Sequence, residues 1–168
     1  MNPEEIIAVA EVVSVATPQI SILAQQIIGM LGGGLVMGLG AVGSGIGLGI
    51  VGSAAVGAWK RCYKGNRPAP PVLLVMCGMP MSQTFYGFIL MLSMLAVTVT
   101  PENAGALLGF GIATGLALCF SAIAQGKIAA AACDALADNS KGLGLYIMAL
   151  GIAESIALFA MVFTMINL

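Results

Sequence analysis

Glu154 lies near the middle of an apolar run from Leu143 to Leu168 that contains no other charged residue. A carboxylate inside hydrocarbon costs several kcal/mol if it is charged and unpaired, and such residues usually mark an ion or substrate site. The alternative is a protonated carboxyl that packs without a role. We therefore take Glu154 as a candidate functional residue and ask which groups surround it.

Two amide side chains are expected at the same depth as Glu154. Counted inward from the predicted loops, Gln83, Gln125 and Glu154 each lie about 12–14 residues from the nearest loop, which is roughly 20 Å at 1.5 Å per helical residue. A lone glutamine in a membrane helix often serves only to join helices. Three polar groups at one level on three spans indicate a shared site.

Oxygen donors next to Gln83 extend this set. Ser82 precedes Gln83, and Tyr86 follows Ser82 by four residues, so both can face nearly the same way on a helix. Pro80 lacks an N–H and should disturb the helix, which can free a carbonyl such as that of Met79. Hard oxygen ligands with a net charge of −1 suit a hard monovalent cation.

The composition places these residues in a membrane protein. Hydrophobic residues make up 60% of the 168-residue chain and charged residues only 8%, against about 25% in soluble domains. The net charge of −1 predicts no nucleic-acid partner. Two literal GxGxxG matches, at 38–43 and 47–52, lack the strand and helix context of a dinucleotide site. With no His and no CxxC pair among four Cys, a transition-metal site is not expected.

Four apolar runs are long enough to cross a membrane as helices, which predicts an all-α membrane protein. They cover Ile22–Trp59, Val72–Thr100, Ala104–Ala137 and Leu143–Leu168, and the first and third should project from the bilayer. Basic residues in the first and third loops predict that both loops are cytoplasmic and both termini are outside. This orientation describes a multi-pass protein of the cell membrane.

An internal repeat organises the chain. SGIGLGIVGSAA (44–55) aligns with SAIAQGKIAAAA (121–132), and MPMSQTFYGF (79–88) aligns with LGIAESIALF (150–159). The chain should therefore be two tandem hairpins in parallel orientation, at 22–100 and 101–168. Residues 1–21 precede them and are predicted to form a short extra-cytoplasmic helix. Gln83 falls opposite Glu154, which leaves one ionisable site per chain.

Small residues on the first and third spans predict close helix packing on both flanks, as in GxxxG pairs. This pattern suits the inner layer of a closed ring, although a four-helix monomer fits the periodicity as well. Lys127 lies two residues beyond Gln125 on a different helix face and is not expected to be a ligand. Its head group could snorkel, line a wet lumen or pair with an acid.

The segments PMSQTFYGF, SAIAQGKIAAAA and GIAESIALF, in this order, resemble the rotor-ring proteolipid (the K or c protein) of V-type and A-type ATPases. The resemblance covers about residues 29–168. It implies a homo-oligomeric ring that turns in the lipid against a stator subunit with a cationic residue, and that contacts central-stalk proteins at the cytoplasmic loops. It also implies a non-catalytic role.

The same resemblance implies a Na⁺ site. Its ligands would be Glu154, Gln83, Gln125, Ser82 and the Met79 carbonyl. Tyr86 would donate a hydrogen bond to the carboxylate, and Ser82 stands where sodium-translocating members often have Thr. The alternatives are the same rotor carrying only H⁺, a small secondary transporter or channel, and a purely structural proteolipid.

Overall fold

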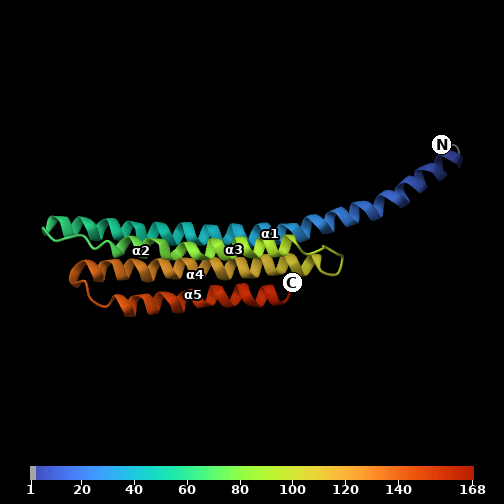
Figure 1. The fold of residues 1–168 in the computed structure, drawn as a ribbon. Coiled ribbons are helices and arrows are strands. Elements are labelled where there is room, and N and C mark those ends of the chain that lie inside the picture. Colours follow the sequence, from blue (N-terminus) through green and yellow to red (C-terminus); the bar gives the residue numbers. More distant parts are fainter. Residues whose placement is uncertain (1–2) are drawn as a thin grey trace.

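The described part of the chain contains helices, joined by short loops and turns, and no strand, as predicted. The computed structural model describes residues 3–168, without the side chains of residues 3, 6, 9–11, 15–18 and 20. Its elements are α1 (Pro3–Lys64), α2 (Val72–Gly78), the 3₁₀ turn η1 (Met79–Met81), α3 (Ser82–Leu95), α4 (Ala104–Asn139) and α5 (Leu143–Ile166). The helices run side by side along one direction. The α1–α2 connection and the α4–α5 connection lie at the same end of the bundle (Figure 1).

Four helical segments have the length and composition to cross a membrane, which confirms the predicted number of spans. They are Ser21–Lys64, Val72–Leu95, Ala104–Asn139 and Leu143–Ile166. The second span ends at Leu95 rather than Thr100, because residues 96–103 form the turn to α4. Asn103 closes this turn: its amide donates to the Thr98 carbonyl at 2.9 Å and its side-chain oxygen accepts the Thr100 N–H at 2.8 Å. In the same turn, a hydrogen bond with the Thr100 side chain lowers the pKa of the Glu102 carboxyl.

The amino-terminal segment differs from the separate short helix expected over residues 1–21. Helix α1 runs without a break from Pro3 to Lys64, and its first part extends beyond the other helices (Figure 1). Packing against the turn begins near Gly29, where an added Cβ would lie 2.7 Å from Val99. The helix continues through Glu11, so a charged residue at this position does not interrupt it. Residues 1 and 2 lie outside the described part.

Pro80 interrupts the second span, as its missing N–H predicts. The backbone tightens into the 3₁₀ turn η1 at Met79–Met81 and resumes as α3 at Ser82. The Pro80 ring is buried against α1, where an added Cβ at Gly47 would lie 2.9 Å from it. The break therefore falls inside the packed part of the bundle, immediately before the polar side chains of α3.

Glycines allow α1 and α4 to pack backbone against backbone. An added Cβ at Gly47 would meet the Ala122 carbonyl oxygen at 2.5 Å, and one at Gly126 would meet the Gly47 Cα at 2.5 Å. The contact between α1 and α4 is the most extensive in the chain. Close approach through small residues is the packing that membrane helices favour, because lipid supplies no hydrophobic force between them.

The core has two apolar clusters separated by a polar layer. One cluster lies toward the loop at residues 65–71 and includes Val51, Leu73 and Leu150. The other lies toward the turn at residues 96–103 and includes Val36, Leu90, Leu118 and Ala157. Gln83 and Gln125 lie between the two clusters, which gives the polar groups a fixed apolar frame on both sides.

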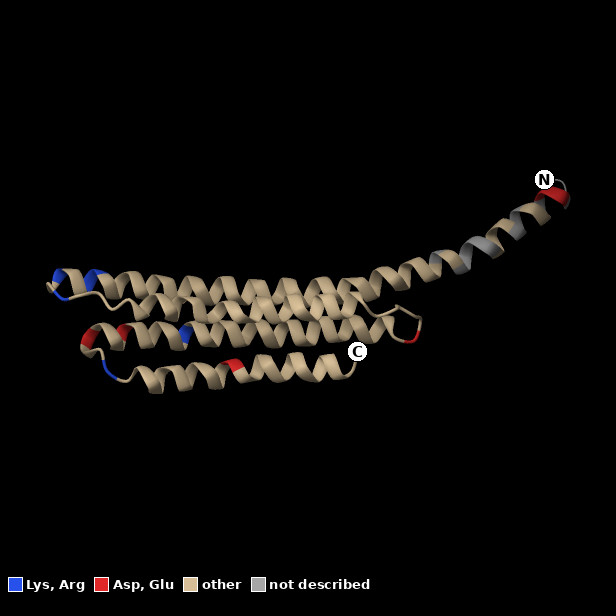
Figure 2. Ribbon diagram, viewed as in Figure 1, with Lys and Arg blue, Asp and Glu red and all other residues tan. Residues whose placement is uncertain are grey.

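Charged residues gather at the end of the bundle that holds the 65–71 loop (Figure 2). Arg61 pairs with Asp134, and the Arg67 guanidinium donates to the Asp138 carbonyl at 3.0 Å. The carbonyl contact places a cation at the end of α4, where the helix dipole favours positive charge. These contacts hold the first loop against the second hairpin.

We predict that Gly126→Leu destabilises the chain, because α1 leaves no room for a side chain there. Overpacking costs about 1–3 kcal/mol or more in the free energy of unfolding. Thermal unfolding followed by circular dichroism in detergent measures it. Gly151→Leu is the matched control, since Gly151 on α5 has open space around its Cα. Equal stabilities of the two variants would contradict the close α1–α4 contact.

Candidate functional site

Glu154 is held on α5 at the boundary between protein and surroundings. Its side chain is half-buried. The Tyr86 hydroxyl donates to Glu154 Oε1 at 2.6 Å, and Gln125 Nε2 donates to Glu154 Oε2 at 3.5 Å. Within the part of the chain that the structure describes, Glu154 makes no ion pair. Neutral donors therefore surround the carboxylate, and no side-chain cation compensates its charge.

Two buried glutamines connect α3, α4 and α5. Gln83 and Gln125 are both 0% exposed. Gln83 Nε2 donates to Gln125 Oε1 at 3.0 Å, and Gln125 Nε2 also donates to the Leu150 carbonyl at 3.4 Å. Buried amides without partners would be costly, so these hydrogen bonds fix both side chains at one depth beside Glu154.

The 3₁₀ turn supplies the oxygen atoms on the other side of Gln83. Ser82 Oγ donates to the Met79 carbonyl at 3.2 Å and lies 3.2 Å from Gln83 Oε1. Met79 is the first residue of the 3₁₀ turn that contains Pro80. The structure thus brings all six predicted residues into one continuous cluster that runs from Met79 to Tyr86.

Ser121 is a member of this cluster that the sequence analysis missed. Its hydroxyl accepts from Gln83 Nε2 at 3.4 Å and donates to the Ala153 carbonyl at 2.7 Å. Ser121 therefore joins α3 to the backbone of α5 beside Glu154. The available signal was its position four residues before Gln125, which places both side chains on the same face of α4.

The first hairpin does not form a second cluster of this kind. In the repeat, Ser44 corresponds to Ser121, and Leu48 corresponds to Gln125. The Ser44 hydroxyl is buried without a hydrogen-bond partner among the described residues, and Leu48 is 41% exposed. The described part of the chain therefore has one such polar site, on the second hairpin, completed by α3 of the first.

Lys127 lies on α4 close in sequence to Gln125, yet it belongs to a different face. Its side chain is exposed, and among the described residues it makes no hydrogen bond or ion pair to the cluster. Lys127 lies on α4, whereas Glu154 lies on α5. Within the described residues, Lys127 therefore makes no contact with the cluster.

The donor set fits a monovalent cation such as Na⁺. Carboxylate, amide, hydroxyl and backbone carbonyl oxygens are the ligands that hard cations prefer. The oxygen atoms of these groups are joined by hydrogen bonds within one cluster. A small ion that took these oxygens as ligands would replace some of those hydrogen bonds. The single negative charge of Glu154 matches one positive charge.

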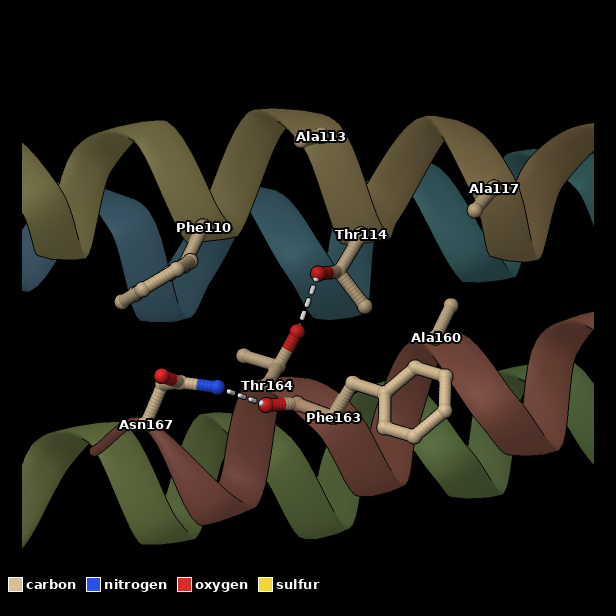
Figure 3. Close-up of a pocket in the computed structure, with 8 residues that line it drawn as sticks. All are labelled: Phe110, Ala113, Thr114, Ala117, Ala160, Phe163, Thr164 and Asn167. Atoms are coloured by element: carbon tan, nitrogen blue, oxygen red, sulfur yellow. Dashed lines mark hydrogen bonds between the residues drawn. The ribbon is translucent and has the colours of Figure 1, made fainter.

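A separate groove of about 340 Å³ lies between α4 and α5. Its polar groups are satisfied: the Thr114 and Thr164 hydroxyls are 2.6 Å apart, and the Asn167 amide donates to the Phe163 carbonyl at 2.6 Å (Figure 3). The remaining lining is apolar, with the Phe110 and Phe163 rings beside it. The groove presents no charged group and is distinct from the Glu154 cluster.

Four membrane-length helices in two tandem hairpins, with one acid in a mid-span polar layer, define a duplicated membrane proteolipid. Two comparisons agree with this class. The family model of the ATP synthase C subunit matches residues 108–167, which is nearly the whole second hairpin. A-type ATP synthase subunit K of Methanocaldococcus jannaschii is 32% identical over 144 residues, covering 84% of this chain.

The second hairpin is thus similar to ATP synthase C subunits, and most of the chain is similar to this K subunit. The chain spans 62% of the length of the Methanocaldococcus relative.

We predict that Ser121→Ala lowers stability by about 1–3 kcal/mol, because it leaves the buried Ala153 carbonyl and Gln83 amide with fewer partners. The measurement is thermal unfolding in detergent. Ser93→Ala is the control, since the Ser93 hydroxyl is exposed and bonds only to the Ile89 carbonyl of its own helix. If both variants unfold at the wild-type temperature, Ser121 does not join α3 to α5 as described.

Proposed function

We propose that the chain is a rotor-ring protein of an A-type or V-type rotary ATPase that carries one Na⁺ per copy on Glu154. The observation that supports this most directly is the cluster of oxygen donors around a half-buried carboxylate that has no cationic partner among the described residues. The similarity to these proteins supports the rotor role. The protein itself would be non-catalytic, with ATP made or hydrolysed elsewhere in the complex.

The electrostatics of Glu154 give a mechanism for coupling rotation to ion movement. With Na⁺ bound, the carboxylate is compensated and the copy can face lipid as the ring turns. Without Na⁺, the bare charge in hydrocarbon is costly, so an empty site must face a cationic residue on the stator. An ion carried across the membrane exchanges about 2.3 kcal/mol per 100 mV of potential.

The charged end of the bundle gives the proposed orientation. The basic first loop and Lys141 favour the cytoplasmic side, as the excess of positive charge in short loops predicts. This end would meet the central-stalk proteins, while the projecting start of α1 would lie outside the cell. The ion site lies between these two ends, within the spans.

Carbodiimide labelling of Glu154 in the purified complex tests the ion. We predict that added Na⁺ at fixed near-neutral pH slows the labelling, because the ion occupies the carboxylate. Labelling that depends on pH but not on Na⁺ would contradict the sodium proposal and favour a rotor that carries H⁺. Native mass spectrometry tests the rotor separately, and a monomer or dimer as the native state would contradict it.

A ligand variant tests the cluster itself. Gln125→Ala should raise the Na⁺ concentration that half-protects Glu154 by roughly tenfold or more, since a hydrogen bond or ligand to a charged group contributes about 1.5–3 kcal/mol. Ser155→Ala is the matched control. Ser155 follows Glu154 directly, but its hydroxyl bonds to the Ile152 carbonyl of its own helix. If the half-protecting Na⁺ concentration changed equally in the two variants, Gln125 would not be a ligand of the ion.

A further inference from the structure

The first part of α1 carries a heptad repeat that the ion site does not use. From Ile6 to Met30, apolar residues recur at alternating steps of three and four, which is the a/d spacing of a coiled coil. A pattern sustained over about four heptads indicates a coiled coil. We call these eight positions the heptad seam. Its a positions are Ile6, Val13, Ile20 and Ile27, and its d positions are Val9, Ala16, Leu23 and Met30.

The rest of the heptad supports this interpretation. Every a position of the heptad seam holds a β-branched residue, which is typical of a positions in parallel coiled coils. The f positions, which are the farthest from the seam on a helix, are Glu4, Glu11, Pro18 and Gln25. Apolar and polar residues are therefore assigned to opposite sides of the segment. A helix of this kind normally covers its apolar side with another part of a protein.

The segment that carries the heptad seam projects from the bundle. Helix α1 is continuous from Pro3 to Lys64, whereas its packing against the rest of the chain begins near Gly29. No other helix of the described chain runs beside the part of α1 before Gly29 (Figure 1). From Gly29 to Lys64 the helix is already roughly 54 Å long, against about 30 Å of hydrocarbon. The projecting part is therefore not needed to cross the membrane.

Where the heptad seam reaches the bundle, it faces away from its own chain. Gly29 and Gly32 are buried against the rest of the chain. The neighbouring seam residues Ile27 and Met30 are 59% and 57% exposed, and Leu23, one turn farther out, is 58% exposed. Large apolar side chains that line up and stay exposed mark a surface for another molecule. The bundle of the same chain does not cover these three side chains.

We infer that the projecting parts of α1 from neighbouring copies associate as parallel coiled coils through the heptad seam. The inference rests on the proposed ring, whose symmetry places identical helices at the same end, in the same direction and in the same register. Each seam then meets its own counterpart, as a/d packing requires. Helix α4 begins at Ala104, near the level of Gly29, so no helix of the described chain stands between the projecting parts.

The charge of the segment favours a second copy over a lipid surface as the partner. Helices that lie on membranes usually carry Lys and Arg on their polar side, which attract anionic headgroups. Residues 1–30 contain no Lys or Arg, and their charged residues are Glu4, Glu5 and Glu11. Anionic headgroups would repel such a helix. In a coiled coil, Glu4 and Glu11 at the f positions would instead point to water.

Cysteine cross-linking in the assembled complex tests the coiled coil. In Leu23→Cys, oxidation should give several-fold more reductant-sensitive dimer than in the wild type, because equivalent d positions lie close together in a parallel coiled coil. The matched control is Ser21→Cys, which is also exposed but lies at a b position off the seam. It should stay at the wild-type level. The wild-type sample accounts for the four native cysteines, which all lie in the membrane-length helices.

The outcomes separate this inference from the rotor proposal. Native mass spectrometry should give the wild-type ring mass for both variants. A ring in which Leu23→Cys yields no more dimer than Ser21→Cys overturns the coiled coil and leaves the rotor proposal standing. A wild-type chain that forms no ring overturns both. If Leu23→Cys forms no dimer but is protected from a water-soluble maleimide, the seam lies on lipid and the inference is wrong.

Discussion

The cost of a carboxylate inside hydrocarbon is the constraint on which the rest of this structure depends. Glu154 cannot stand alone in an apolar span, and the chain surrounds it with neutral donors from neighbouring helices. Those donors are themselves buried and need partners, so Gln83, Gln125 and Ser121 are linked to one another and to the α5 backbone. Apolar clusters lie on both sides of this layer. Among the described residues no lysine or arginine pairs with this carboxyl group, which is consistent with the proposed binding of a cation there.

The polar layer can form only because the helices come unusually close. Glycines on α1 and α4 place the two backbones in contact, and α3 and α5 pack beside this pair. Pro80 adds a local adjustment: it lies in the 3₁₀ turn whose Met79 carbonyl accepts a hydrogen bond from the Ser82 hydroxyl. The glycines of α1 and α4 and the 3₁₀ turn at Pro80 therefore help to position the polar side chains of the site.

Much of this arrangement could be predicted from the sequence. Hydropathy defines the four spans, the repeat defines the two hairpins, and counting from the loops places Gln83, Gln125 and Glu154 at one depth. The features that could not be predicted from the sequence were missed for physical reasons as well. Ser121 escaped notice because a serine in a membrane helix commonly bonds to its own backbone, and sequence alone does not show that α5 lies opposite it. The continuous start of α1 was also missed, since a charged residue such as Glu11 lowers hydropathy without lowering helix propensity.

The first repeat has Gln83 where the second has Glu154, and this difference sets the number of ions that the proposed rotor carries in each turn. Each chain contributes four helices to the proposed ring. If both hairpins carried an acid, the same length of circumference would hold two ion sites instead of one. With one acid per chain, a ring of given size carries half as many ions in each turn. The energy of one turn is then divided among fewer ions, so each can be moved against a steeper gradient. Driven in reverse, the same ring would need a larger membrane potential to supply an equal amount of work.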